Sequence, residues 1–273
     1  MPVLSDTQRA WLTDSYASEL VHAAEQAADA ARAIIKPLFR SKLVASAKTD
    51  GSPVTIADKR AELEMRTVLA SLYPDFGILG EEYGLDRPGA SLRWVLDPID
   101  GTRSFITGRP IFGTLIALMD EGVPVLGIID QPITGERWIG LKGRPTQYTG
   151  SLGGEVGTRK VALLSQAEMS CTAPDMIASA DFSNWQNLSD SVRRVSWGGD
   201  CYAYGLLSLG QVDIVAEGDL KVWDWAAIQP IVEGAGGAVV DWAGNTPQET
   251  GDGRILAVGD EALLPKILRI LNA

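Results

Sequence analysis

Residues 94–102 read Trp94-Val95-Leu96-Asp97-Pro98-Ile99-Asp100-Gly101-Thr102. An apolar run of strand length ends here in two carboxylates three residues apart, Asp97 and Asp100. Pro98 fixes the turn between them, and Gly101 permits a close approach of the backbone to a ligand. Such a turn can direct both carboxylates towards the same point, where they could bind one ligand. A single acid after a strand is more often a turn or cap residue than a ligand, but this pair favours a functional site.

Two other segments carry acidic residues at the end of a predicted strand or at the start of a predicted helix. The apolar residues 76–79 are followed by Gly80-Glu81-Glu82, and further along the chain Trp223-Asp224 begins a helical pattern. For Asp224 alone, a helix cap is the simpler interpretation. Together with Asp97 and Asp100, however, Glu81 and Asp224 would form the oxygen-rich ligand set that Mg²⁺ prefers. Two such ions can clamp the attacking and leaving oxygens of a phosphoryl displacement and activate water, so the pattern favours metal-activated hydrolysis.

Composition excludes several other classes of protein. The chain has 24 Lys and Arg against 35 Asp and Glu, a net charge of −11 and a pI near 4.6, which argues against nucleic acid as a partner. A single histidine, His22, argues against a Ser-His-Asp triad, a three-histidine zinc site and a phosphohistidine. Cys171 and Cys201 form no disulfide or metal-binding pattern. With no secretion signal and no apolar span of about 20 residues, we expect a soluble, cytoplasmic protein with no membrane partner.

Hydrophobic spacing predicts an α/β chain in which helices cover sheets. Ser5 with Gln8 and Thr55 with Asp58 match capping boxes, and the patterns that follow predict helices up to residues 39 and 72. Short apolar runs predict strands at residues 76–79, 92–96, 114–118, 123–129, 176–178, 212–216, 237–240 and 255–258. Helical patterns also cover residues 201–209, 224–234 and 261–271. The Gly-, Thr- and Ser-rich residues 142–157 predict a connection between two halves.

Four motifs follow one another along the chain: Gly80-Glu81-Glu82, Asp97-Pro98-Ile99-Asp100-Gly101-Thr102, Trp223-Asp224 and the run Gly-Gly-Ala-Val-Val-Asp at 236–241. In this order they resemble the inositol monophosphatase family of metal-dependent, lithium-sensitive phosphatases. The D-P-I-D-G-T element is highly specific, and the resemblance spans nearly the whole chain. It implies one α/β domain, residues 1–273, folded as the five-layer αβαβα sandwich of the inositol monophosphatase and fructose-1,6-bisphosphatase type. It also implies a homodimer, with halves of about 1–145, carrying most metal motifs, and 158–273, carrying the leaving-group pocket and the last metal ligand.

The resemblance further implies roles for individual residues. Two or three Mg²⁺ ions per active site would be bound by Glu81, Asp97, the Ile99 carbonyl, Asp100 and Asp224. Thr102 would act with Glu81 to orient the nucleophilic water. The backbone N–H groups of Gly101 and Thr102 would receive the phosphate beside Asp100. The third implied catalytic residue, Asp58, would lie near a third metal ion, with capping of the following helix as its alternative role.

Other segments are most similar to the histidinol-phosphate phosphatase branch of the family: residues 104–110, 113–118, 199–205 and 231–237. Histidinol carries an ammonium group and an imidazole, whereas the inositol ring is uncharged. Asp200 and Glu217 are therefore interpreted as leaving-group contacts, and an added carboxylate could favour the cationic substrate by about 1.5 to 3 kcal/mol. The alternatives are that Asp200 caps the helix beginning at Cys201 and that Glu217 is a solvated turn acid. The chain departs from the branch at residues 221–224, Lys-Val-Trp-Asp, where Lys-Pro-Tyr-Asp is common.

The resulting expectation is a Mg²⁺-dependent phosphomonoesterase of histidine biosynthesis that hydrolyses L-histidinol phosphate, a small phosphorylated metabolite, to histidinol and phosphate. A first alternative is an inositol monophosphatase or a phosphatase of broad specificity for small esters. A second alternative, from a different class of protein, is a regulatory binding partner that retains the fold without relying on catalysis.

Overall fold

The computed structural model describes residues 14–42, 46–47 and 53–273 of the chain. A seven-stranded sheet in the first half has the order β4-β3-β5-β6-β7-β8-β9. Its strands are β3 (Gly77–Gly80), β4 (Gly84–Asp86), β5 (Leu92–Asp100), β6 (Gly113–Asp120), β7 (Val123–Gln131), β8 (Glu136–Leu141) and β9 (Gln147–Thr149). Only the β3–β5 pair is parallel in this sheet. The short strands β1 (Ser46–Ala47) and β2 (Pro53–Val54) pair separately.

A five-stranded sheet in the second half has the order β11-β10-β12-β14-β13. Its strands are β10 (Glu168–Cys171), β11 (Arg194–Trp197), β12 (Ile214–Glu217), β13 (Ala238–Asp241) and β14 (Ile255–Val258). The end of β12 and the end of β10 lie at the same edge of this sheet, because these two strands run parallel. Residues that follow them therefore meet at one place.

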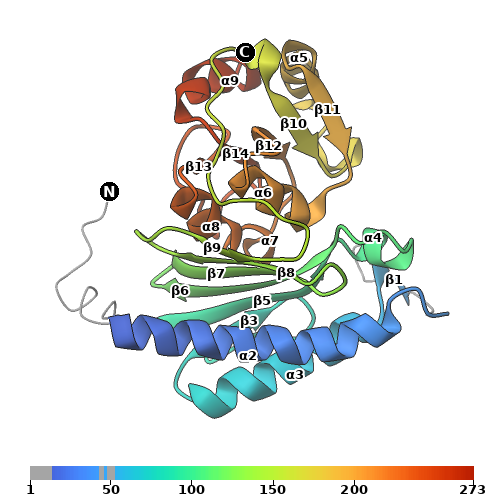
Figure 1. The fold of residues 1–273 in the computed structure, drawn as a ribbon, viewed down its shortest axis with the longest axis vertical. Coiled ribbons are helices and arrows are strands. Elements are labelled where there is room, and N and C mark those ends of the chain that lie inside the picture. Colours follow the sequence, from blue (N-terminus) through green and yellow to red (C-terminus); the bar gives the residue numbers. More distant parts are fainter. Residues whose placement is uncertain (1–13, 43–45, 48–52) are drawn as a thin grey trace.

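Helices separate and cover the two sheets (Figure 1). They are α2 (Asp14–Leu38), α3 (Ile56–Leu72), α4 (Thr102–Ile106), α5 (Phe182–Ser191), α6 (Asp200–Ser208), α7 (Val222–Trp225), α8 (Ile228–Gly234) and α9 (Leu264–Leu271), with short 3₁₀ turns η1 (Leu164–Gln166), η2 (Pro174–Met176) and η3 (Glu261–Leu263). The helices α2 and α3 cover the outer face of the first sheet, α6, α7 and α8 lie between the sheets, and α5 and α9 cover the far side. The expected αβαβα layering is confirmed.

The helix α2 packs against α3 and the first sheet through a row of small side chains. Ala24, Ala27, Ala28 and Ala31 are completely buried, which lets the helix lie close to its neighbours. The predicted helix is confirmed from Asp14 onward, while the Ser5 capping box falls outside the described residues. None of the helices in the described ranges has the length and apolar character needed to cross a bilayer.

The inner helices approach the first sheet closely enough to require glycine on its strands. A Cβ at Gly127 would collide with the carbonyl of Ala227, and a Cβ at Gly140 would collide with the backbone of Ile231. This close packing fixes α8 against β7 and β8, while α7, directly before it, contacts β5 and β6. It thereby places Asp224, on α7, above the end of β5.

One predicted strand is wrong, and several elements were not predicted. Residues 176–178 do not form a strand: Pro174 begins a 3₁₀ turn, after which Ile177 is buried by packing without joining a sheet. The predicted helix at 224–234 is split into α7 and α8, and the connection at 142–157 contains β9. The strands β8, β10 and β11 and the helix α5 are among the elements that were not predicted. The remaining predicted strands are confirmed with end shifts of at most two residues, except that the strand predicted at 92–96 extends four residues further, to Asp100.

Candidate active site

The turn after β5 is held in shape by its own polar groups. The backbone N–H of Ile99 donates to Asp97 Oδ1 at 2.9 Å, and the hydroxyl of Thr114 on β6 donates to the carbonyl of Pro98 at 2.8 Å. The pairing of β5 with β6 shifts register between Asp97 and Asp100. This irregularity brings two acids from one strand end to the same side, as the Asp-Pro-Ile-Asp spacing indicated.

Four acidic side chains meet at this turn. Asp97, Asp100 and Asp224 each offer a carboxylate oxygen, and these oxygens all lie within 4.8 Å of one another. The carboxyl group of Glu81, in the turn after β3, lies within hydrogen-bonding reach of Asp97. Three separate segments, around residues 81, 97–100 and 224, are thus brought together as the sequence predicted. Oxygen donors of this kind, close together and shielded from solvent, fit a hard divalent cation.

The electrostatics of the cluster also fit a cation. Burial, followed by the neighbouring charges of Glu81, Asp100 and Asp224, raises the pKa of Asp97 well above its ordinary value. Burial and the carboxylates of Asp200 and Asp224 do the same to the pKa of Asp100. Burial raises the pKa of Asp224 to about 7. Like charges at such close range are costly unless a positive charge lies among them.

The metal-free protein is expected to lose thermal stability as the pH rises towards about 8. In the unfolded chain an Asp has a pKa of about 3.9, whereas the pKa of Asp224 in the folded protein is about 7. Between these values the folded state retains a proton that the unfolded state has lost, so this stabilising contribution is complete below pH ~4 and disappears as the pH passes ~7.

Thermal unfolding in chelator between pH ~5 and ~8 would measure this loss of stability. Asp224→Asn, which has no carboxyl group to titrate, should flatten the profile, and Mg²⁺ should reverse the loss at high pH because it binds ionised carboxylates. Identical profiles for the wild-type protein and the variant would contradict the prediction.

Thr102 and Asp58 form a second polar unit beside the cluster. The hydroxyl oxygen of Thr102 lies 3.3 Å from Asp58 Oδ1 and 3.2 Å from the Ile99 carbonyl oxygen. The other carboxylate oxygen of Asp58 accepts hydrogen bonds from the backbone N–H and the hydroxyl of Thr55, at 2.8 and 2.6 Å. The capping box predicted at Thr55 is therefore confirmed, and the same Asp58 side chain also reaches Thr102.

The Gly101-Thr102 backbone does open a helix. Gly101 has a φ of 86° and is the N-cap of α4. Its lack of a side chain is required by a neighbour as well as by the backbone, since a Cβ there would overlap the carboxylate of Asp200. Asp200 consequently lies directly against the turn that carries the acidic cluster.

Asp200 does not cap α6, so that alternative is wrong. The residue is the first of the helix, with a φ of 46°, and its carboxylate turns towards α4, where it accepts a hydrogen bond of 2.6 Å from the hydroxyl of Ser104. It is Asp100 that accepts a hydrogen bond from the backbone N–H of Cys201. Burial raises the pKa of Asp200, while Ser104, Arg109 and Arg103 act in the opposite direction.

Glu217 is not a solvated turn acid either. It lies at the end of β12, only 2% exposed, and accepts hydrogen bonds from the backbone N–H of Thr172 at 2.6 Å and from the hydroxyl of Tyr204 at 2.8 Å. Burial raises its pKa. A narrow cavity of about 40 Å³ is lined by residues from both halves of the chain, including Asp100, Thr172, Asp200, Glu217 and Asp224.

Two hydrogen-bond partners of Asp200, Thr172 and Ser104, were not predicted. Thr172 follows β10, and its hydroxyl accepts a hydrogen bond of 3.0 Å from the backbone N–H of Asp200. Ser104 binds Asp200 from a position 96 residues away in the sequence. Neither residue has a spacing that could have identified it, because the Thr172 contact spans 28 residues within the second half and the Ser104 contact joins the two halves.

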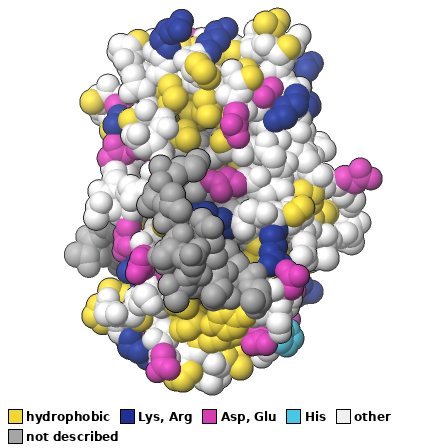
Figure 2. Space-filling model, turned by 90° about the vertical axis from the view of Figure 1, so that its left-hand side faces the viewer, with side chains coloured by type: hydrophobic (Ala, Val, Ile, Leu, Met, Phe, Trp, Pro, Cys, Tyr) yellow, Lys and Arg dark blue, Asp and Glu magenta, His cyan; other side chains and the backbone are white. Residues whose placement is uncertain are grey.

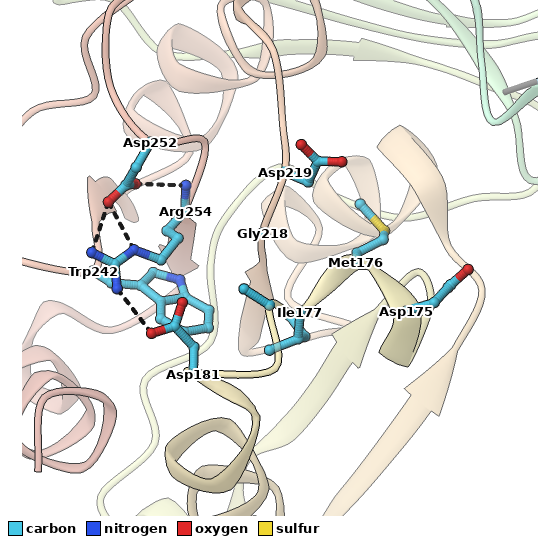
Figure 3. Close-up of a pocket in the computed structure, with 10 residues that line it drawn as sticks. Asp175, Met176, Ile177, Asp181, Gly218, Asp219, Trp242, Asp252 and Arg254 are labelled. Atoms are coloured by element: carbon cyan, nitrogen blue, oxygen red, sulfur yellow. Dashed lines mark hydrogen bonds and ion pairs between the residues drawn. The ribbon is translucent and has the colours of Figure 1, made fainter. Parts of the chain in front are cut away.

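A second, larger cavity of about 410 Å³ adjoins the first, with Met176 lining both (Figure 3). On one side Arg254 pairs with Asp252 and Asp181, and its guanidinium lies 5.7 Å from the centre of the Trp242 ring. The exposed carboxylates of Asp175 and Asp219 lie on the other side. The surroundings of the site are thus predominantly acidic.

On the face shown in Figure 2, the basic side chains of the described residues lie scattered among acidic and apolar ones.

Comparison with known proteins places these features in a family. A family model described as the inositol monophosphatase family matches residues 17–273. Among curated relatives, the bifunctional phosphatase IMPL2, chloroplastic, of Arabidopsis thaliana is 43% identical over 89% of this chain and 70% of its own length. A histidinol-phosphatase of Mycobacterium tuberculosis is 34% identical over 83% of this chain and 87% of its own.

The solved structures agree with this assignment. An inositol monophosphatase from Zymomonas mobilis is 44% identical, with a TM-score of 0.85 over 94% of this chain and 98% of its own. The chain therefore belongs to the inositol monophosphatase family, whose enzymes are metal-dependent phosphatases acting on small phosphorylated substrates.

Proposed function

We propose that the protein is a Mg²⁺-dependent phosphomonoesterase whose substrate is L-histidinol phosphate. The observation that carries this proposal is the pair of buried carboxylates, Asp200 and Glu217, which line the same cavity as Asp100 and Asp224. A leaving group with an ammonium group would find charge-assisted acceptors there, whereas an uncharged polyol would gain less. The names of the relatives support the same substrate, since two of them are histidinol-phosphatases at 34% identity.

In this proposal the metal ligands are Glu81, Asp97, the Ile99 carbonyl, Asp100 and Asp224. Two or three Mg²⁺ ions bound there would stabilise charge on the phosphoryl oxygens and lower the pKa of the attacking water. The N–H groups of Gly101 and Thr102, at the start of α4, would receive the phosphate. Residues from both halves of the chain contribute, so residues 1–273 act as one catalytic domain.

Thr102 and Asp58 would orient and deprotonate the water. The Thr102 hydroxyl has two acceptors within reach, Asp58 Oδ1 and the Ile99 carbonyl oxygen. When it donates to Asp58, a lone pair of its oxygen can accept a hydrogen bond from water. A proton can then pass from the water through Thr102 Oγ1 to Asp58, whose pKa is raised by burial. The structure thus favours Asp58 as the partner of Thr102 in handling the proton, with Glu81 kept as a metal ligand that also faces the water.

The substrate is tested by measuring phosphate release from L-histidinol phosphate and from inositol 1-phosphate side by side, with Mg²⁺ present. We expect a clear preference for histidinol phosphate. Equal rates, or faster release from inositol 1-phosphate, would favour the second candidate, a broader or inositol-specific phosphatase, which the Zymomonas mobilis structure supports by its name. Light scattering and cell fractionation test a homodimer and a cytoplasmic location, which we also propose.

Asp200→Ala is expected to lower kcat/KM for histidinol phosphate by about 10- to 100-fold, because a charge-assisted hydrogen bond contributes about 1.5 to 3 kcal/mol. The loss with inositol 1-phosphate should be much smaller. Ser104→Ala is the matched control: it removes the 2.6 Å hydrogen bond to Asp200 but keeps the carboxylate. If Asp200→Ala slowed both substrates equally, or Ser104→Ala changed selectivity as much, Asp200 would have no role in recognising the leaving group.

A further inference from the structure

One face of α3 carries three buried polar side chains spaced four residues apart. They are Asp58, Glu62 and Arg66, which are 0%, 0% and 8% exposed. This spacing places them in one row along the helix, facing the first sheet. Asp58 reaches Thr102, as described above. The next residue in the row, Glu62, takes no part in the proposed chemistry, and its burial as a charged group therefore requires an explanation.

The Glu62 carboxylate lies beneath the turn that carries Glu81. It accepts hydrogen bonds from the backbone N–H groups of Glu82 at 2.7 Å and Tyr83 at 3.2 Å. A Cβ at Gly80 would overlap this carboxylate, so the glycine before Glu81 is what allows the approach. The Gly80-Glu81-Glu82 backbone is thereby shaped to the side chain of Glu62.

Arg66 secures Glu62 and the far end of the same turn. Its Nε donates to Glu62 Oε1 at 2.8 Å, and its other nitrogens reach the Asp86 carboxylate at 2.9 Å and the Gly84 carbonyl. The charged pair therefore holds both sides of the turn between β3 and β4. On the sheet side, the backbone N–H of Glu81 donates to the carbonyl of Leu96, the residue before Asp97. The backbone around Glu81 is therefore held by Glu62 on the helix side and by Leu96 on the sheet side.

We propose that Glu62 is a positioning residue that fixes the Gly80–Tyr83 backbone so that Glu81 can bind metal together with Asp97. This inference rests on the proposed function, in which Glu81 is a ligand. A side chain that only stabilised the fold could be apolar, whereas this one accepts hydrogen bonds from the two N–H groups that directly follow the ligand. Partners that orient a ligand in this way typically change metal affinity by about 10- to 100-fold when they are removed.

Glu62→Gln keeps the size of the side chain and tests the inference. The amide nitrogen cannot accept a hydrogen bond, so the variant cannot satisfy the Glu82 N–H, the Tyr83 N–H and Arg66 Nε as the carboxylate does. Isothermal titration calorimetry with Mg²⁺ should give a Kd about 10- to 100-fold higher than that of the wild-type protein. The increase in Tm caused by Mg²⁺ should shrink accordingly. Activity should recover at saturating Mg²⁺, with KM for the substrate unchanged.

Two variants of the same helix separate positioning from general destabilisation. Glu64→Gln makes the same chemical change at an exposed position and should leave affinity unchanged. Met65→Ala opens a cavity in the buried core and should lower Tm while Mg²⁺ still binds with the wild-type Kd.

Three results would count against this account. A wild-type Kd for Glu62→Gln, or an equal loss of affinity in Met65→Ala, would overturn the positioning role alone. Wild-type protein that bound no Mg²⁺ would overturn the proposed metal site, and the role of Glu62 with it.

Discussion

Asp97→Asn is expected to lower kcat/KM by about 10³-fold or more. Bound metal contributes several kcal/mol to a phosphoryl transition state, and each 1.36 kcal/mol corresponds to a factor of ten in rate. Asp97 is 2% exposed and interacts with Glu81, Asp100 and Asp224, so it contributes to every part of the cluster. An amide at this position would keep the shape of the side chain but remove the charge that attracts the cation.

Although it lowers activity, the same substitution should stabilise the metal-free protein. Because burial and like charges raise the pKa of Asp97, its ionised form is unfavourable in the metal-free protein. Removing that charge should raise Tm in chelator at neutral pH and abolish the further increase on adding Mg²⁺. Thermal unfolding and phosphate release measured on the same sample check both effects. Asp190→Asn, on the exposed side of α5, serves as the control that should change neither. Wild-type turnover by Asp97→Asn would remove this residue from the metal site.

Thr102→Val is expected to lower kcat by about 10²- to 10⁴-fold, the range typical of losing acid–base catalysis. The valine is nearly isosteric but has no hydroxyl to connect a water molecule with Asp58 Oδ1, 3.3 Å away. Affinity for Mg²⁺ should change little, because the Thr102 side chain is not a ligand in the proposal. Steady-state kinetics with a parallel metal titration separate these effects.

Two further variants make the prediction for Thr102 more specific. Thr102→Ser retains the hydroxyl and should keep most of the activity. Asp58→Asn should lower kcat in the same way and also lower the free energy of unfolding by about 0.5 to 2 kcal/mol, because Asp58 belongs to the capping box of α3. Full activity in Thr102→Val would assign deprotonation of the water to another group.

The sequence was sufficient to predict the acidic cluster because most of its members lie within short motifs. Asp97 and Asp100 follow an apolar strand, with Pro98 between them and Gly101 directly after them. This local pattern already implies a turn that brings both carboxylates to one site. The capping box of Thr55 and Asp58 could be predicted for the same reason, since both partners lie within one helical turn.

Contacts between distant segments could not be predicted in this way. Ser104 and Asp200 are 96 residues apart, and only the packing of α4 against α6 brings them together. Asp200 was open to interpretation as a helix cap because Asp is common at such positions, yet its positive φ turns the side chain elsewhere. Glu62 lies four residues after Asp58, but its partners at Glu82 and Tyr83 emerge only once β3 lies beside α3.

Strand errors have a similar cause. Within residues 176–178 only Ile177 is buried, and it packs into the core without joining a sheet, while Ala178 is exposed. A short apolar run can therefore occur where no strand forms. The strand β11 was not predicted: it lies at the edge of its sheet with three of its four residues exposed, and its alternation of polar and apolar residues extends over four positions only.

The most direct test of the account is the rate of phosphate release from L-histidinol phosphate by chelator-treated protein as Mg²⁺ is added back. The carboxylate cluster predicts no release above background in chelator and a saturable return of activity with Mg²⁺. Release that proceeded at the same rate in chelator would contradict a mechanism that depends on metal held by Asp97, Asp100 and Asp224.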